Sequence, residues 1–174
     1  GARNPGVEHA EGEIIALMDG DCIADLEWLE NLTDYFENHD IVECNVTYAS
    51  DREKNCPMDR VVENDGLEYR FLGAGLAFRK EVWRTSRFDE DLEFHDDTAF
   101  GLAALENNFS YTYGQRAEIN HHAGRFNSKS FIQERLRFRD EAKFYEKYGE
   151  LERAENEIDN LGPILHPKEF AMLG

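Results

Sequence analysis

A short apolar run that ends in acidic residues constrains the fold of this chain more than any other feature. The run is EIIALM at residues 13–18, and Asp19, Gly20 and Asp21 follow it directly. Its length and apolar character predict a buried β-strand. In α/β proteins, ligands bind beyond the carboxyl ends of the strands. The two carboxylates therefore stand where a binding site is expected.

Short apolar runs alternate with longer amphipathic stretches along the rest of the chain, which indicates an α/β fold. Further strands are expected at residues 41–48, 73–79, 109–113 and 117–121, with a polar loop at 52–59. Helices are expected at residues 25–38, 61–71, 80–85, 97–107, 128–148 and 151–161. The helical spacing predicts an apolar face made of Leu26, Leu29, Leu32, Tyr35 and Phe36 in the first helix, and of Phe131, Phe138, Ala142 and Tyr145 in the fifth. One expected strand precedes the acidic turn, so a nucleotide pocket of this kind requires further strands before Gly1.

The charge of the chain excludes one large class of function. Its 37 acidic and 19 basic residues give a net charge of −18, and the acids are dispersed along the sequence. General nucleic-acid binding requires a basic face, so no nucleic-acid partner is expected. A dispersed acidic surface with 13 Arg and only 6 Lys suggests a salt-adapted, halophilic host. No apolar stretch reaches the ~20 residues that span a bilayer, so no transmembrane segment is expected.

The residues after the first strand have the chemistry of a metal and phosphate site. Carboxylate oxygens such as those of Asp19 and Asp21 suit Mg²⁺ or Mn²⁺, and these ions bridge phosphate oxygens. Gly20 lets a diphosphate approach the backbone closely. The alternative is an ordinary solvated turn with an Asx motif. The position of the pair directly after an apolar strand favours the binding site.

Several motifs around this turn resemble those of family-2 glycosyltransferases in order and spacing. They are Ala2-Arg3-Asn4-Pro5-Gly6, Ala10-Glu11-Gly12-Glu13, the apolar strand, Asp19-Gly20-Asp21, Asp25 and Trp28-Leu29. The resemblance implies a GT-A fold, an α/β fold with a mixed sheet flanked by helices, which here lacks its N-terminal strands. It places Arg3 near the nucleotide base, Asp19 and Gly20 at the donor or the metal, and Asp21 at the metal. The other interpretation of Arg3 is a surface cation in an N-terminal turn.

Later motifs extend the same resemblance. Residues 73–80 read GAGLAFRK, residues 88–92 read FDEDL, and Asp96-Asp97-Thr98 stands where the family has an acidic pair before a helix. By this resemblance Asp97 is the general base and Asp96 its neighbour on the acceptor or phosphate side. An acid at a helix N-terminus is also a common cap, favoured by the free amides and the helix dipole. The cap keeps a lowered pKa, so capping and proton abstraction are compatible.

A histidine pair follows the last expected strand. The family places a histidine in this region, where it completes the metal shell or binds the donor phosphate. His121 continues the alternation of Ala117 and Ile119, whereas His122 is one residue late. The ordinary interpretation of a lone histidine is a satisfied surface or core residue. The resemblance therefore assigns His121, together with Asp21, to the metal.

The resemblance implies a metal-dependent, inverting transfer from a nucleotide diphosphate sugar to an acceptor hydroxyl, with Mn²⁺ or Mg²⁺ as cofactor. The acceptor is a sugar, a lipid-linked molecule or a protein, and a homo-oligomer stays open. Three scattered cysteines without a disulfide framework fit a cytoplasmic location, at the inner face of the membrane if the acceptor is lipid-linked. Residues 1–127 are expected to form a partial GT-A catalytic domain, and residues 128–174 a helical extension packed on it.

Two other functional classes remain open. One is a non-catalytic GT-A-like module for binding or assembly, favoured by Ala99 at a position where the family often has an acid. The other is a different metal-dependent enzyme acting on nucleotide phosphates. Such enzymes commonly carry a glycine-rich phosphate loop with Lys or Arg near the first strand, and the sequence shows none.

Overall fold

The computed structural model describes residues 2–48, 63–64, 69–122 and 139–148. Five strands form one mixed sheet in the order β1-β4-β3-β5-β2. They are β1 Ile14–Met18, β2 Cys22–Ala24, β3 Ile41–Tyr48, β4 Gly75–Arg79 and β5 Tyr111–His121. β3 and β5 run parallel, whereas β1 with β4, β4 with β3 and β5 with β2 are antiparallel. The sheet is therefore mixed, as expected for a GT-A fold.

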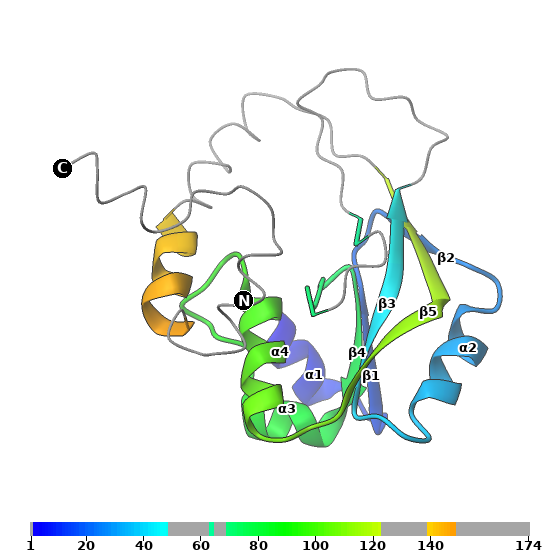
Figure 1. Ribbon diagram of the computed structural model, residues 1–174, viewed down its shortest axis with the longest axis horizontal. Coiled ribbons are helices and arrows are strands. Elements are labelled where there is room, and N and C mark those ends of the chain that lie inside the picture. The colour runs from blue at the N-terminus through cyan, green and yellow to red at the C-terminus, as the bar shows by residue number, and fades with distance from the viewer. Residues whose placement is uncertain (1, 49–62, 65–68, 123–138, 149–174) are drawn as a thin grey trace.

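Helices cover both faces of this sheet (Figure 1). They are α1 Arg3–His9, α2 Trp28–Tyr35, α3 Lys80–Ser86, α4 Asp96–Glu106 and an unlabelled helix at residues 139–148. α2 packs on one face and α1, α3 and α4 lie on the other. Successive residues of a strand point to opposite faces, so each of the middle strands contributes to both cores. The result is a three-layer arrangement of helix, sheet and helices.

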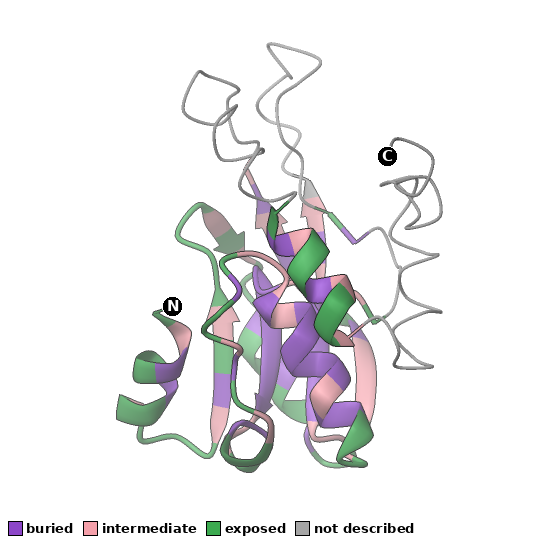
Figure 2. Cartoon of the chain, turned by 90° about the vertical axis from the view of Figure 1, so that its left-hand side faces the viewer, coloured by how far each residue is buried: buried purple, intermediate pink, exposed green. Residues whose placement is uncertain are grey.

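The larger core lies between the sheet and α4. Most residues of α4 are buried, because this helix packs on the face of the sheet (Figure 2). Phe78, Phe88 and Phe100 form its aromatic centre, with ring centroids 4.3–5.9 Å apart. Phe144 of helix 139–148 joins the same core. The division into residues 1–127 and 128–174 stays a prediction.

The expected strands and short helices are largely confirmed. β3 has the predicted bounds, β1, β4, α3 and α4 differ from prediction by one or two residues, and α2 is shorter at both ends. The two strands expected at 109–113 and 117–121 are one strand, β5, whose pairing with β3 shifts register between Cys44 and Asn45. The shift absorbs the polar residues that made the sequence look interrupted. The expectation that β1 is buried is wrong, since among its residues only Ile15 is buried.

Two apolar faces were predicted correctly only in part: Leu32 and Phe36 of the first set are buried, and Phe131 and Phe138 of the second lie outside the described residues. In α2 the buried residues are Trp28 and Leu32, whereas Leu26 and Leu29 are exposed. Helical spacing fits the set with Leu26 and Leu29 as well as the set with Trp28 and Leu32. Packing against the sheet buries the second set, which includes the large indole ring of Trp28. In helix 139–148 the buried apolar residue is Phe144. Ala142 of the expected stripe is exposed.

A helix predicted at residues 61–71 is also wrong at its described residues. Residues 63–64 and 69–71 are not helical. Tyr69 and Phe71 have φ angles of 62° and 51°, in the left-handed region that a right-handed helix excludes. The loop expected at 52–59 and the helix expected at 151–161 lie outside the described residues.

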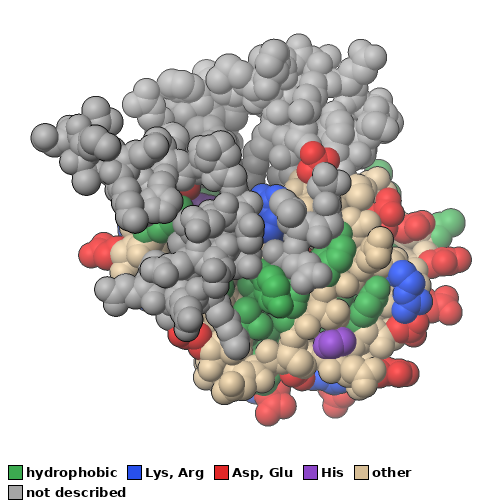
Figure 3. All heavy atoms as spheres, in the orientation of Figure 1, with side chains coloured by type: hydrophobic (Ala, Val, Ile, Leu, Met, Phe, Trp, Pro, Cys, Tyr) green, Lys and Arg blue, Asp and Glu red, His purple; other side chains and the backbone are tan. Residues whose placement is uncertain are grey.

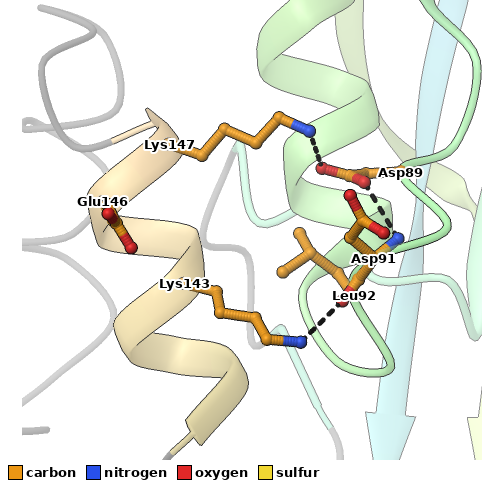
Figure 4. A pocket seen from close by; sticks show the side chains of 6 residues that line it. All are labelled: Asp89, Asp91, Leu92, Lys143, Glu146 and Lys147. Carbon is orange, nitrogen blue, oxygen red and sulfur yellow. Dashed lines mark hydrogen bonds and ion pairs between the residues drawn. The ribbon is translucent and has the colours of Figure 1, made fainter.

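Helix 139–148 is held to the rest of the molecule through buried carboxylates. Asp89 Oδ2 lies 2.6 Å from Lys147 Nζ and accepts a hydrogen bond from the Tyr148 hydroxyl at 2.9 Å. Asp140 is fully buried and accepts the backbone amide of Glu93 at 2.8 Å. A groove of about 520 Å³ lies between this helix and the 89–92 loop, with the Lys147–Asp89 ion pair and the hydrogen bond from Lys143 to the Asp91 carbonyl along it (Figure 4). The helix is thus attached by polar contacts around a single buried ring, Phe144.

Acidic side chains are scattered over the visible face of the molecule (Figure 3). No single cluster gathers them there, in agreement with their dispersal in the sequence. None of the helices in the described residues has the length and hydropathy needed to cross a bilayer. Adaptation to salt stays a prediction.

We predict that Gly101→Ala lowers the free energy of unfolding. A Cβ at Gly101 would lie 2.1 Å from Phe71 Cγ, and overpacking of a core costs about 1–3 kcal/mol. Gly6→Ala is the matched control, because Gly6 is also helical and a Cβ there meets nothing within 4 Å. That control should gain about 0.5–1 kcal/mol from helix propensity. Urea unfolding measures both, and equal effects would contradict the packing.

We further predict that acid releases helix 139–148 before the sheet unfolds. Burial raises the pKa of Asp89 and of Asp140, but hydrogen bonds outweigh it and hold both below the ordinary 3.8. A lowered carboxyl pKa contributes stability above the unfolded pKa that is lost as the pH falls through the folded value. Protection factors from hydrogen exchange should therefore fall for residues 141–148, and not for β3, below pH ~4. In Asp140→Asn this pH dependence should shrink; an undiminished dependence would exclude Asp140 as its source.

Candidate active site

The Asp19-Gly20-Asp21 turn crosses one edge of the sheet. β1 ends at Met18 opposite Gly75, the first residue of β4, and β2 begins at Cys22 opposite His121, the last residue of β5. β1 and β2 stand at opposite ends of the strand order. The turn between them must therefore pass over the ends of the middle strands. The sheet places the two acids over the edge where β3 and β5 finish.

The acids of this turn surround a buried histidine. His121 Nε2 lies 3.8 Å from Asp19 Oδ2 and 3.5 Å from Asp21 Oδ1. Its Nδ1 lies 2.7 Å from the carbonyl oxygen of His122. If Nδ1 donates to that carbonyl, the neutral ring keeps the Nε2 lone pair directed at the acids. The alternation predicted for Ala117, Ile119 and His121 is confirmed, since all three are buried.

This first cluster has the donor atoms of a divalent-metal site. Ligand atoms of Asp21, Cys22 and His121 lie within 4.8 Å of one another. The hydrogen bond to Asp19 raises the pKa of His121, against the effect of burial. Burial and the Asp19 charge raise the pKa of Cys22 to about 11, so its thiol is protonated at neutral pH. The carboxylates of Asp19 and Asp21 suit Mn²⁺ or Mg²⁺, and a thiol that stays protonated is a poor ligand, so the acids present fit the expected ion.

A second cluster gathers at the start of α4. The guanidinium of Arg3, at the start of α1, contacts Asp96 Oδ1 and lies 3.9 Å from Asp97 Oδ2. Asp96 and Asp97 raise the pKa of Arg3 above its usual value, although burial opposes them. Arg3 is therefore no free surface cation. Asp97 Oδ2 also accepts the Gly73 amide at 2.8 Å, and Asp97 Oδ1 accepts the Thr98 amide at 2.9 Å.

The interpretation of these acids as helix caps is not confirmed. α4 begins at Asp96, and its N-cap is His95, in a left-handed conformation with φ of 65°. Asp96 and Asp97 therefore lie in the first turn. Burial raises the pKa of Asp96, with Arg3 opposing it, so the lowered pKa expected of a capping acid is wrong for Asp96.

The segment from Gly73 to Gly75 joins the two clusters. The Gly73 amide binds Asp97, and the next carbonyl, of Ala74, accepts from Cys22 Sγ at 3.9 Å. A Cβ at Gly73 would lie 2.3 Å from Arg3 Nη2 and 2.9 Å from Asp97 Oδ2. Glycine thus lets the backbone pass between Arg3 and the acids without displacing either side chain. A Cβ at Gly20, by contrast, would meet nothing within 4 Å, so the turn has open space beside it.

The sequence did not predict a role for two buried polar residues, Asn4 and Glu43. Asn4 is buried beside Arg3, accepts from Trp83 Nε1 at 2.9 Å and donates to the Phe88 carbonyl at 2.9 Å. It fixes α1 against the 88–92 loop and so orients Arg3. Its presence in the A-R-N-x-G motif was a signal for this role. The second residue, Glu43, lies in an apolar strand, where no local pattern distinguishes it.

Comparisons with known proteins agree with this architecture. Residues 1–79 match the family model described as glycosyl transferase family 2. The chain is 30% identical over 123 residues to the uncharacterized glycosyltransferase EpsJ of Bacillus subtilis (strain 168), a match that covers 60% of this chain and 36% of that protein. It therefore spans about a third of the length of this curated relative.

Solved structures of S. aureus TarS share the fold. TarS 1–349 in complex with UDP-GlcNAc superposes with a TM-score of 0.53 at 20% identity, covering 74% of this chain and 40% of that one. The complex of the same protein with UDP gives 0.51 at 20% identity, with 69% and 38% covered. At this identity the likeness shows a GT-A-type fold. Together, the family match at the motif-bearing end, the related glycosyltransferase and the shared fold support a family-2 glycosyltransferase.

Proposed function

We propose that this chain carries the transfer site of an enzyme that moves a sugar from a nucleotide diphosphate sugar to an acceptor hydroxyl. The supporting observation is the convergence of two clusters, Asp19-Asp21-His121 and Arg3-Asp96-Asp97, on the two sides of the Gly73–Ala74 backbone. A sugar nucleotide transfer needs a charge-stabilising group at the diphosphate and a base at the acceptor, close together. The two clusters supply one of each. Binding of a nucleotide sugar is also consistent with the relatives, since a TarS structure of this fold holds UDP-GlcNAc.

Asp97 is the better candidate for the general base. The side chain of Asp96 is 11% exposed and contacts Arg3 directly, whereas that of Asp97 is 21% exposed. The Gly73 and Thr98 amides hold one oxygen each of Asp97, so its carboxylate is fixed in orientation. Asp97 would take the proton of the acceptor hydroxyl as its oxygen attacks the anomeric carbon opposite the nucleotide, which inverts the configuration. Asp96 keeps Arg3 in place beside it.

Asp21 and His121 would hold Mn²⁺ or Mg²⁺, and Asp19 would help to hold the ion or contact the donor. When bound, such an ion neutralises charge that develops on the leaving diphosphate. The histidine ring is fixed through its Nδ1 contact with the His122 carbonyl, which orients Nε2 towards the two acids. Gly20 leaves room for the diphosphate beside the turn. Arg3 lies at the other cluster, where its charge can meet the donor.

The non-catalytic alternative loses one of its arguments. Ala99, where the family often has an acid, is buried in the core with α4. Its side chain therefore packs against apolar neighbours rather than at the site. An alanine at this position therefore fits the apolar core, and the contacts among Arg3, Asp96 and Asp97 do not involve it.

We predict that Asp97→Asn lowers kcat for sugar transfer by about 10²–10⁴-fold, because the amide cannot accept the proton. The variant keeps an oxygen for the Gly73 amide, so donor binding should survive. The measurement is kcat of the full-length gene product for sugar transfer from a nucleotide sugar to an acceptor, with the product separated and quantified by chromatography. Asp34→Asn, which alters an exposed ion pair with Arg116, is the control and should keep its rate. Retained transfer in Asp97→Asn would remove Asp97 from the role.

We also predict that Asp21→Ala abolishes the binding of Mn²⁺ seen by calorimetry. The substitution removes one of the two carboxylates that face His121 Nε2. Asp25→Ala is the matched control, since Asp25 is a nearby exposed acid whose carboxylate accepts its neighbouring amide, that of Leu26. Unchanged Mn²⁺ affinity in Asp21→Ala would show that the metal is held elsewhere or is not used.

A further inference from the structure

We propose that Glu43, a buried acid of β3, is a positioning residue for the transfer reaction, because it holds the 69–73 segment that presents the Gly73 amide to Asp97. This inference rests on the function proposed above. Glu43 touches neither cluster of the site. It would act through the backbone that separates them.

Glu43 is completely buried, on the face of the sheet that packs against α4. Its Oε2 accepts the Tyr111 hydroxyl at 2.9 Å and the Arg70 amide at 3.1 Å, and its Oε1 faces the Leu72 amide at 3.5 Å. The Tyr111 oxygen in turn accepts the Tyr69 amide at 2.8 Å. Three groups thus donate to one carboxyl, and two belong to the backbone of a single short segment.

A buried carboxyl needs such compensation. Burial raises the pKa of Glu43, while hydrogen bonds from the Tyr111 side chain and from the backbone at Phe71 and Leu72 lower it. A buried polar group that lacked these partners would be strongly unfavourable. The retention of an acid here therefore requires the segment to keep its amides directed at Glu43. The coupling works in both directions: the segment satisfies the acid, and the acid fixes the segment.

The segment held in this way has an unusual backbone. Tyr69 and Phe71 adopt positive φ angles, which non-glycine residues avoid unless the surroundings determine them. Phe71 is completely buried against Gly101 of α4, and the Thr98 hydroxyl donates to the Arg70 carbonyl at 3.2 Å. Glu43 contacts the segment from the sheet, and Thr98 and Gly101 contact it from α4. The segment is clamped on both sides.

The end of the clamped segment is part of the site. Leu72, whose amide faces Glu43, is followed directly by Gly73, whose amide binds Asp97. A shift of the segment would move that amide and the carboxylate it holds. Misplacement of a catalytic group by about 1 Å is sufficient to cost about 10²-fold in rate. Glu43 thus influences the position of Asp97 through the backbone of Leu72 and Gly73.

The test compares Glu43→Leu, Glu43→Gln and Tyr111→Phe in the full-length gene product. Glu43→Leu removes every acceptor and should lower kcat by about 10²-fold, with unchanged Mn²⁺ affinity, because the Asp21-His121 cluster does not contact the segment. Glu43→Gln keeps one oxygen for the Arg70 amide and should lower kcat less than the leucine variant. Tyr111→Phe keeps the acid and removes one of its hydrogen-bond donors. It replaces Glu43→Leu as the test if the leucine variant fails to fold.

The matched control is Cys44→Ala, the next residue of β3. Cys44 is equally buried but faces α2 on the other side of the sheet. This variant should lose stability while keeping kcat. If lost stability alone lowered the rate, kcat would fall in Cys44→Ala as well as in Glu43→Leu.

A second readout follows the hydrogen bond itself. In ¹⁵N spectra, the Gly73 amide resonance should move and exchange faster in the variants at positions 43 and 111, whereas the Gly20 amide should not. Full kcat with an unmoved Gly73 resonance in a folded Glu43→Leu or Tyr111→Phe would overturn the inference. If Asp97→Asn also keeps its rate, the proposed function fails; if Asp97→Asn is inactive, the positioning role of Glu43 fails alone.

Discussion

The site depends on how closely the backbone at Gly73 passes between Arg3 and the acids of α4. A Cβ at this position would force the Arg3 guanidinium and the Asp97 carboxylate to shift. The missing side chain lets α1, the start of β4 and the start of α4 meet at one point. Charge then holds them, since Arg3 is bonded to Asp96 and faces Asp97. This close approach brings Arg3, Asp97 and the Gly73 amide together.

Around this point three buried polar side chains each bind groups on other segments of the chain. Asn4 connects α1 to Trp83 and Phe88, Glu43 connects β3 to the 69–72 backbone, and Asp140 connects helix 139–148 to the 93–94 backbone. In a protein interior such groups are costly when unpaired, so each of them specifies one arrangement of the segments it joins. The three links all surround α4, the most deeply buried helix. The apolar core supplies the adhesion, and these polar links supply the alignment that a transfer site needs.

The sequence predicted the strands well because their apolar runs are short and bounded by polar residues. It was less successful for the helical faces of α2 and of helix 139–148, where two overlapping sets of residues have helical spacing. Leu29 and Trp28 are neighbours, and only contact with the sheet decides that Trp28 is buried. The 69–71 segment was mistaken for helix because its backbone is determined by Glu43, Phe71 and Gly101, residues distant in sequence. Local pattern carries no information about such contacts.

The sequence by itself determined the class of fold and the resemblance to a family, because these depend on short motifs whose order along the chain is preserved, and the same motifs supplied the candidate site residues. Tertiary structure decided which of those residues meet. Asp19 and Asp21 reach His121 because β2 pairs with β5 in a register that sets Cys22, the residue after Asp21, opposite His121. Arg3 reaches Asp96 across 93 residues of chain because a glycine leaves space for it. Distances between segments remote in sequence are set by packing and by the pairing of buried polar groups, which no local pattern records.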